Sequence, residues 1–414
     1  MIAPPEAADL DFSNWQFTAP VSPKLHWNLR REMALRGFKW DAQIGDVCTL
    51  APFALILPRS VWENLSHITA KLTEEFFGFE NALMQRPDLW RMLGLPKRLL
   101  STLDADAPWT PGAARVMRFD FHPTRGGWKI SEVNSDVPGG FTEASRFTQR
   151  MAELIGDGAV PSGDPTASLT EALCRFVKTY GRVALVAAPG YIEDQQVVAN
   201  IADALRQRGV ESMIASPEDL EWREGIAHLC NGEGMRPVDL VYRFYQGEWM
   251  TRLCGRGWAS FFRGGLTPVC NPAAAILSES KRLPLLWDRL GVSCSTWREI
   301  LPVTKTAMVA ITQPAKAWVI KGAYSNTGDA VFARSWKGSA YATALAKAVI
   351  HPCSWLAQEQ FEPIYLATPV GPAHICIGVY VIESQVCGIY ARLTSKELID
   401  YRALDTAVLI KNRI

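Results

Sequence analysis

The stretch between residues 114 and 134 constrains the fold most, because it predicts a β-hairpin. Residues 114–121 mix Val, Met and Phe with polar residues, and residues 128–134 alternate apolar and polar side chains. The segment between them reads HPTRGG, and this combination of Pro with paired Gly is typical of a turn. We therefore expect two strands joined by a turn, with the side chains of each strand alternating between two faces.

Four polar side chains would lie on one face of this hairpin. Arg118 and Asp120 share a face of the first strand, and Glu132 and Asn134 share a face of the second. If even-numbered positions pair with even-numbered positions, all four groups converge. Carboxylate and amide oxygens suit Mg²⁺ that holds nucleotide phosphates, and an adjacent Arg suits an anion. The alternative is the solvated face of an ordinary hairpin. The apolar neighbours and the Gly-rich turn SDVPGGF at 135–141, whose backbone N–H groups could bind an anion, favour the metal site.

Length and composition exclude several classes of protein. A chain of 414 residues is too long for one compact core, so we expect two or three subdomains. The net charge of +1 argues against a general nucleic-acid binder. The nine Cys are scattered without a CxxC pair, which indicates reduced thiols and neither a disulfide framework nor a zinc site. No signal peptide or long apolar run is visible, so we expect a cytoplasmic protein without a membrane segment.

The chain divides into four predicted regions. Residues 1–110 are expected to be mainly helical, with helices over 61–79 and 81–93, and 111–180 to hold the hairpin and the helix that follows it. Residues 181–272 are expected to form an α/β domain, and 273–414 to return to mixed elements after a helix over 273–290 that Pro284 bends or breaks. The segment 156–165 is rich in Gly, Pro, Ser and Asp and is predicted to be a linker.

The α/β domain has the pattern of a parallel sheet. A buried strand at 182–188 (RVALVAA) is followed by an amphipathic helix at 193–208 and by strands at 210–215 and 238–245. The turn after the first strand reads APGY, so the dinucleotide fingerprint GxGxxG is missing, and the chain has no Walker A sequence.

Two lysines and one strand in the last region carry further signals. Lys321 ends the strand WVIK and is followed by the loop GAYSNTG at 322–328, where a Lys can pair with phosphates while the loop closes over them. Lys281 lies in LSESKR, and the apolar strand WLAQEQF contains Glu359, a buried acid that needs a partner. Each of these signals alone also fits an ordinary turn or a solvated Lys.

Together these motifs resemble the glutathionylspermidine synthase-like ligases, which are ATP-grasp enzymes with a circularly permuted order. The resemblance depends on R-x-D at Arg118, E-x-N at Glu132 and the Gly turn, followed late in the chain by Lys281 and Lys321. It covers roughly residues 110–410. It implies a mixed α+β and α/β fold: an ATP-grasp core with permuted order, a small Rossmann-like pre-ATP-grasp domain and a helical N-terminal region.

The resemblance also implies ATP and Mg²⁺ as cofactors and assigns roles to residues. Asp120, Glu132 and Asn134 would hold Mg²⁺, and Arg118 would stabilise negative charge on the transferred phosphoryl group. The residues implied in nucleotide binding are Lys281, Lys321, Gly322, Ser325, Asn326, Thr327, Gly328, Gln358, Glu359, Gln360 and Arg392.

The implied reaction is ATP-dependent ligation of a small-molecule or peptide carboxylate to an amine through an acylphosphate. The family usually carries hydroxyl residues in the turn after E-x-N, whereas this chain has VPGG at 137–140, which counts against glutathione as the acid. Any oxyanion contact there would come from backbone N–H groups or from Thr142. Two alternatives remain: a small-molecule kinase, and a nucleotide-binding module without catalysis.

Overall fold

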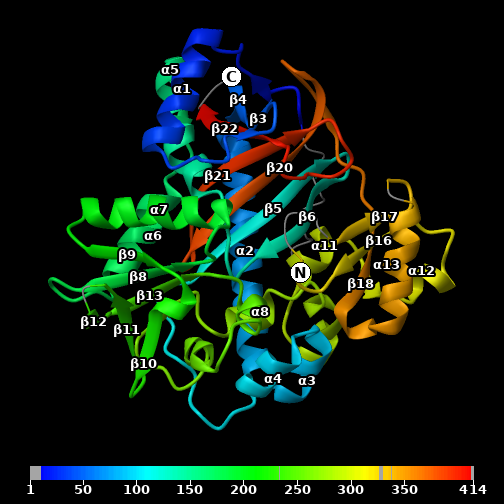
Figure 1. Cartoon of the computed structure of the whole chain (residues 1–414). Helices are drawn as coiled ribbons and strands as arrows, with labels where there is room; N and C mark the ends of the chain where they lie inside the picture. The colour runs from blue at the N-terminus through cyan, green and yellow to red at the C-terminus, as the bar shows by residue number, and fades with distance from the viewer. Residues whose placement is uncertain (1–10, 233, 326–329, 337, 412–414) are drawn as a thin grey trace, which may run out of the picture.

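A nine-stranded mixed sheet forms the centre of the molecule (Figure 1). The computed structural model describes residues 11–232, 234–325, 330–336 and 338–411. The sheet has the order β1-β4-β22-β21-β20-β5-β6, with β19 paired to β20 and β7 paired to β22. Its strands are β1 (Gln16–Phe17), β4 (Leu50–Pro58), β5 (Val116–Thr124), β6 (Gly127–Asn134), β7 (Val160–Pro161), β19 (Tyr365–Thr368), β20 (Gly371–Ile382), β21 (Gln385–Thr394) and β22 (Leu404–Lys411).

Both faces of this sheet are covered by helices from the first 155 residues of the chain. The long helix α2 (Arg59–Met84) packs its apolar residues against one face, while α1 (Pro23–Arg36) and α5 (Thr148–Ile155) pack against the other. Strand β4 shows the result, because Leu55 belongs to the cluster with α2 and Ile56 to the cluster with α1 and α5. The region expected to be mainly helical thus also supplies a central strand, which pairs in parallel with β22.

Short elements complete the N-terminal region. The sequence predicts helices over 61–79 and 81–93, but the structure continues the first helix to Met84 and then forms only short turns of helix. These elements are β2 (Gln43–Ile44), β3 (Val47–Cys48), α3 (Pro87–Trp90), η1 (Arg91–Leu93) and α4 (Lys97–Leu103).

The predicted hairpin is present as β5 and β6, and its register pairs even positions with even positions. Asp120 lies opposite Glu132, and Arg118 lies opposite Asn134. The strands extend further than predicted, so that Thr124 pairs with Gly127 and the turn is shorter than HPTRGG. The helix predicted after the Gly-rich turn begins with a π-helical segment, η2 (Glu143–Phe147), and continues into α5.

The α/β domain contains the predicted parallel sheet, in the order β14-β13-β8-β9. Its apolar cluster also includes Tyr380 and Tyr390 of the central sheet, which fixes the domain against the hairpin. The predicted linker at 156–165 instead contains the short strand β7, since Val160 and Pro161 pair with β22. The elements are α6 (Pro165–Cys174), β8 (Arg182–Ala187), α7 (Ile192–Gln207), β9 (Glu211–Ala215), η3 (Pro217–Asp219), β10 (Leu220–Arg223), β11 (Ile226–Asn231), β12 (Gly234–Pro237), β13 (Leu240–Phe244), α8 (Gly247–Met250), η4 (Gly257–Phe261) and β14 (Val269–Cys270).

A second antiparallel sheet, β15-β18-β16-β17, stands beside the hairpin with α13 on its outer side (Figure 1). The helix predicted over 273–290 is divided into three short pieces, with Pro284 in the middle one. The elements are α9 (Ala275–Ser278), η5 (Leu283–Leu286), α10 (Trp287–Leu290), α11 (Ser295–Ile300), β15 (Thr304–Thr306), α12 (Val309–Thr312), β16 (Trp318–Gly322), β17 (Val331–Ala333), α13 (Gly338–Ile350), η6 (Pro352–Ser354) and β18 (Trp355–Glu359). Among the described helices, none is both long and apolar enough to cross a membrane.

Candidate functional site

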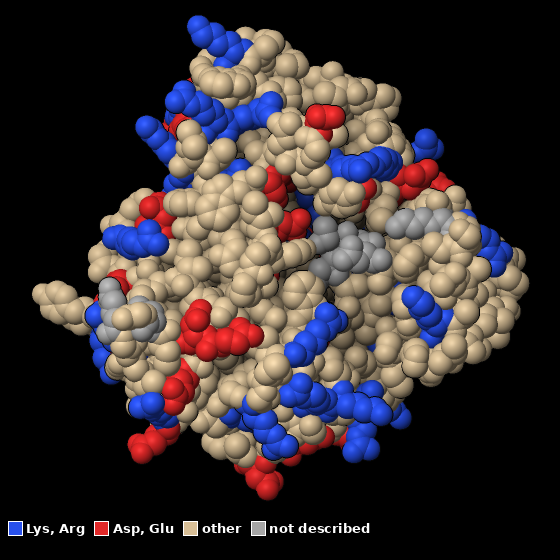
Figure 2. All heavy atoms as spheres, in the orientation of Figure 1, with Lys and Arg blue, Asp and Glu red and all other residues tan. Residues whose placement is uncertain are grey.

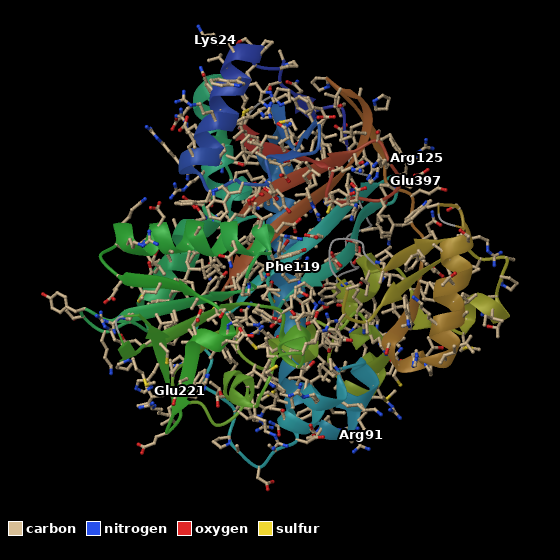
Figure 3. The ribbon with its side chains drawn as sticks, viewed as in Figure 1. Lys24, Arg91, Phe119, Arg125, Glu221 and Glu397 are labelled. Atoms are coloured by element: carbon tan, nitrogen blue, oxygen red, sulfur yellow. The ribbon has the colours of Figure 1, made fainter. Side chains whose placement is uncertain are left out.

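A cavity of about 270 Å³ lies where the hairpin, the second sheet and the α/β domain meet. Figure 3 labels Phe119, which lies near the middle of the molecule on the strand that carries Arg118 and Asp120. The cavity collects predicted residues from segments far apart in the sequence. Those that line it are Arg118, Asp120, Glu132, Asn134, Lys321, Ser325, Gln358, Glu359, Gln360 and Arg392.

Asp120 is the centre of a buried polar cluster on the hairpin. Its side chain is 1% exposed and accepts two hydrogen bonds from Arg118, at 2.7 Å from Nε and 2.9 Å from Nη2. Asn134 Nδ2 and Arg392 Nη2 each lie 3.3 Å from Asp120 Oδ2. Two guanidinium groups therefore share one carboxylate, which leaves a surplus of positive charge for an anion in the cavity.

Glu132 and Lys281 form an ion pair beside this cluster. Lys281 Nζ lies 3.1 Å from Glu132 Oε2 and also donates to the backbone oxygen of Ser325 at 2.7 Å. Burial alone would raise the pKa of Glu132, but the ammonium groups of Lys281 and Lys321 lower it to about 2. Glu132 is thus a carboxylate at neutral pH.

Lys321 is a buried cation whose hydrogen-bond partners, among the described residues, are neutral groups. Its Nζ donates to Gln358 Oε1 at 2.7 Å and to the backbone oxygen of Ser131 at 3.2 Å. Burial lowers the pKa of Lys321 to about 8, and although Glu132 raises it in part, Lys281 lowers it further. A phosphate group beside this amine would supply the missing negative charge.

The remaining predicted nucleotide contacts have different positions. Gly322 closes the base of the loop, since its N–H donates to the backbone oxygen of Ala330 at 3.0 Å, and the carboxylate of Glu359 pairs with Lys316. Lys281 does not line the cavity but reaches it through Glu132. The three predicted contacts Asn326, Thr327 and Gly328 lie outside the described residues. The nucleotide-binding roles of all these residues stay predictions.

The Gly-rich turn presents a backbone carbonyl to the hairpin cluster. Gly139 O accepts from Arg118 Nη1 at 3.0 Å and from the Tyr380 hydroxyl at 2.6 Å. Gly140 has φ +86°, and a Cβ there would collide with Tyr390, so only Gly suits this position. Thr142, the one hydroxyl residue that the sequence offered nearby, is buried and does not line the cavity.

The hairpin oxygens fit a divalent cation that shares its ligands with a nucleotide. Within the described residues, no three His, Cys, Asp or Glu side chains are grouped to hold a metal alone. Asp120 and Glu132 are cross-strand neighbours next to Asn134, so they offer hard oxygen donors at one place. Such a small set suits Mg²⁺, which is usually held by one or two carboxylates together with phosphate oxygens and water.

A second, acidic end of the cavity has no counterpart in the sequence predictions. Figure 2 shows acidic side chains beside a hollow near the centre of this face of the molecule. The carboxylates that line the cavity there come from loops, from η2, from α7 and from β22, with one lysine among them. These residues are Lys39, Asp41, Glu143, Glu193, Asp194 and Asp405.

Two buried oxygens at this acidic end lack donors among the described residues. They are Asp194 Oδ2 and Gln246 Oε1, on residues that are 7% and 6% exposed and line the cavity. Burial raises the pKa of Asp194 to about 7, with a further contribution from Glu193. Buried acceptors without donors are costly, so this end of the cavity suits a ligand that brings N–H groups and positive charge.

The sequence contained one usable signal for this end. Glu193 and Asp194 stand in the first turn of the predicted helix, where acidic residues also favour the helix dipole. Because the helix dipole already accounts for acidic residues at these positions, the sequence did not mark Glu193 and Asp194 as binding residues. Lys39 and Asp405 belong to no motif.

The chain resembles known proteins in its fold and in its sequence. A glutathione synthetase-like effector from Globodera pallida has a similar structure, with TM-score 0.63 and 14% identity over 94% of this chain and 98% of that one. A putative gamma-glutamylcysteine synthetase from Methylobacillus flagellatus matches with TM-score 0.42 and 12% identity, over 80% and 85% of the two chains. A comparison with curated protein sequences finds no match. The model of the family "Glutathionylspermidine synthase preATP-grasp" matches residues 22–410. The chain therefore belongs to this family and is an ATP-dependent ligase of the ATP-grasp type.

Proposed function

We propose that the protein joins a carboxylate to a cationic amine through an acylphosphate, with cleavage of ATP to ADP. The observation that carries this proposal is that one cavity is lined by two groups of side chains of opposite charge. One group comprises Lys321, Arg118 and Arg392, whereas the other supplies a surplus of carboxylates and, within the described residues, acceptors without donors. A reaction between an anion and an amine needs both environments within one enclosed space.

The cationic end would bind the nucleotide and the acid. Lys321 would neutralise phosphate oxygens, and Arg118 would face the negative charge that develops on the transferred phosphoryl group. Asp120, Glu132 and Asn134 would hold Mg²⁺, which supplies charge neutralisation on the phosphates. The hydrogen bonds of Arg118 to Asp120 and Gly139 fix its guanidinium before any ligand binds.

The proposed reaction has two balanced steps. An oxygen of the substrate carboxylate bonds to the γ-phosphorus of ATP, the bond to the β-phosphate oxygen breaks, and ADP leaves. The amine nitrogen then bonds to the acyl carbon, phosphate leaves, and the nitrogen loses a proton. No protein nucleophile is required, so catalysis consists of positioning and charge stabilisation.

The acidic end would hold the amine. Asp194 and Gln246 supply acceptors that lack donors, and Glu193 adds a nearby carboxyl group whose pKa is raised by burial and by neighbouring acids. A bound ammonium would satisfy the acceptors and favour the ionised carboxylates. The family's name includes spermidine, and an amine that carries a further ammonium group is consistent with this charge distribution.

The test is a screen of acid–amine pairs for ATP turnover, with the product identified by mass spectrometry. We expect ADP formation to require one specific pair, and hydroxylamine in place of the amine to trap the acyl group as a hydroxamate. Glu132→Gln should lose at least about 100-fold of this turnover, whereas Lys305→Met, at an exposed position on the same sheet as Lys321, should retain it. A phosphoester product would establish the kinase alternative, and turnover that Glu132→Gln leaves unchanged would refute the assigned site.

A further inference from the structure

Lys39 is a buried lysine inside the acidic end of the cavity. Lys39 is 2% exposed. Its Nζ lies 2.6 Å from Asp41 Oδ1, 2.5 Å from Glu143 Oε1 and 2.9 Å from Asp405 Oδ2. Burial alone would lower the pKa of Lys39, but the three carboxylates hold it well above its usual range. Lys39 is therefore a permanent ammonium within a group of acids.

The chain around Lys39 is fixed in place. Lys39 follows α1 in a loop whose next two backbone N–H groups, of Trp40 and Asp41, donate to Gln196 Oε1 on α7 at 3.0 and 3.4 Å. Lys39 N–H also donates to Met33 O on α1 at 3.0 Å. The loop thus places the ammonium at the junction of three separate elements and adds it to the lining of the cavity.

The acidic end is consequently divided into a filled part and an open part. The filled part, which we call the Lys39 trio, consists of Asp41, Glu143 and Asp405. The open part consists of Glu193 and Asp194, together with the acceptor of Gln246; for the described residues, Asp194 Oδ2 and Gln246 Oε1 have no donor. Two groups of acids of this kind could accept two ammonium ions, and the chain itself supplies one of them.

We propose that Lys39 determines the specificity for the amine, because its ammonium occupies the Lys39 trio and leaves room for only one cationic group of the ligand. The preferred amine is then a short one that carries a single ammonium besides its reacting nitrogen, as in a diamine. A longer polyamine gains nothing from its additional charge. That this amine is a substrate rests on the proposed function.

Removal of the lysine charge should open the trio to the ligand. In Lys39→Met, three buried carboxylates lose their counter-ion, and the additional ammonium of a longer polyamine can replace it. A charged ligand group that pairs with desolvated carboxylates gains much more than one that stays in water. Lys39→Arg keeps the charge and is the matched control.

The experiment is calorimetric titration of the whole protein with putrescine, a diamine, and with spermidine, which carries one further ammonium. For the wild type and for Lys39→Arg, we expect the two dissociation constants to agree within about threefold. For Lys39→Met, spermidine should bind at least about tenfold more tightly than putrescine. An unchanged ratio in Lys39→Met would overturn the proposal, as would a tenfold preference in Lys39→Arg or the absence of amine binding by all three proteins.

A double variant and a stability measurement cover the case in which Lys39→Met is unstable. Lys39→Met/Asp405→Asn removes one carboxylate together with the ammonium, and we expect the preference for spermidine to shrink back toward the wild-type ratio. If Lys39→Met needs spermidine to stay folded during purification, its thermal unfolding midpoint is measured with each amine added in turn. The midpoint should rise more with spermidine than with putrescine, and equal effects would contradict the proposal. These titrations contain no nucleotide, so they separate the two hypotheses. A protein that forms the amide without the shift in ratio refutes only the role of Lys39.

Discussion

Replacement of Lys321 by Met should stabilise the folded protein at neutral pH but weaken nucleotide binding. Lys321 is 8% exposed, and burial lowers its pKa from 10.5 to about 8. A pKa that is lower by about 2.5 corresponds to a free-energy cost of about 3 kcal/mol, because each pKa unit is worth about 1.36 kcal/mol. The folded state bears this cost at pH 7, where the amine is charged in both the folded and the unfolded chain.

Met fills a similar volume without a charge, but it leaves two acceptors without a donor. Gln358 Oε1 and Ser131 O would lose their hydrogen bonds from Lys321, at a cost of roughly 1 to 2 kcal/mol. The net gain at pH 7 is therefore about 1 to 2 kcal/mol. Between about pH 8 and 10.5 the folded protein holds fewer protons at this site than the unfolded chain, so the wild type gains stability as the pH rises. The advantage of Lys321→Met should shrink across this range and change sign between about pH 9 and pH 10, where the remaining charge cost equals the cost of the lost hydrogen bonds.

Urea unfolding of both proteins at pH 7 and pH 10 measures this effect through the difference in midpoints. Lys305→Met, at an exposed position on β15 of the same sheet, is the control and should shift neither midpoint. Titration with Mg²⁺ and a non-hydrolysable ATP analogue should show that Lys321→Met binds it at least about tenfold more weakly. A Lys321→Met protein that is less stable than the wild type at pH 7, or a difference that does not depend on pH, would refute the reasoning.

Three further outcomes follow from the site. Glu132→Gln should keep the fold, because Lys281 can still donate to the amide oxygen, but it should lose Mg²⁺-dependent nucleotide binding by at least about 100-fold in calorimetry; unchanged binding would remove Glu132 from the site. Asp194 has a pKa of about 7 in the ligand-free protein, so affinity for putrescine should fall as the pH drops below 7, and Asp194→Asn should flatten this dependence when both proteins are titrated from pH 5.5 to 8.5. Gly140→Ala places a side chain on a residue with left-handed backbone, against Tyr390. It should lower the free energy of unfolding by about 1 to 3 kcal/mol, measured as a lower thermal unfolding midpoint. Gly126→Ala, whose new Cβ would meet open space, should show no comparable loss.

The hairpin and its polar face could be predicted because their signals are local. Alternation with period two and one turn are enough to place Arg118, Asp120, Glu132 and Asn134 together, and the register confirms it. Strand β4 lacked this signal. Leu55 and Ile56 are buried on opposite faces of the sheet, so the strand reads as a continuous apolar run that does not distinguish a strand from a helix.

The acidic end could not be predicted, because its geometry is entirely non-local. Lys39 contacts Glu143 and Asp405. More than half of the chain separates Lys39 from Asp405 in the sequence. Each residue alone resembles an ordinary charged residue of a loop, a helix or a strand end. Only the packing of α1, η2 and β22 makes them one cluster, and the burial that gives them chemical significance is a property of that packing.

The ion pair of Lys281 with Glu132 also makes a prediction about the metal. In the ligand-free protein these two charges neutralise each other at 3.1 Å, with side chains that are 10% and 24% exposed. If a nucleotide without Mg²⁺ drew Lys281 toward its phosphates, Glu132 would stay behind as a buried carboxylate with less compensation, and this cost would oppose binding. With Mg²⁺ the carboxylate would receive a new cation while the lysine moved to an anion, so that both charges would keep a partner. We therefore expect nucleotide affinity to fall strongly in EDTA in the wild type. In Glu132→Gln, which has no carboxylate to compensate, the weak remaining affinity should depend little on the metal. Calorimetry with and without Mg²⁺ measures both values, and an equal dependence on Mg²⁺ in the two proteins would show that the exchange at Glu132 does not control binding.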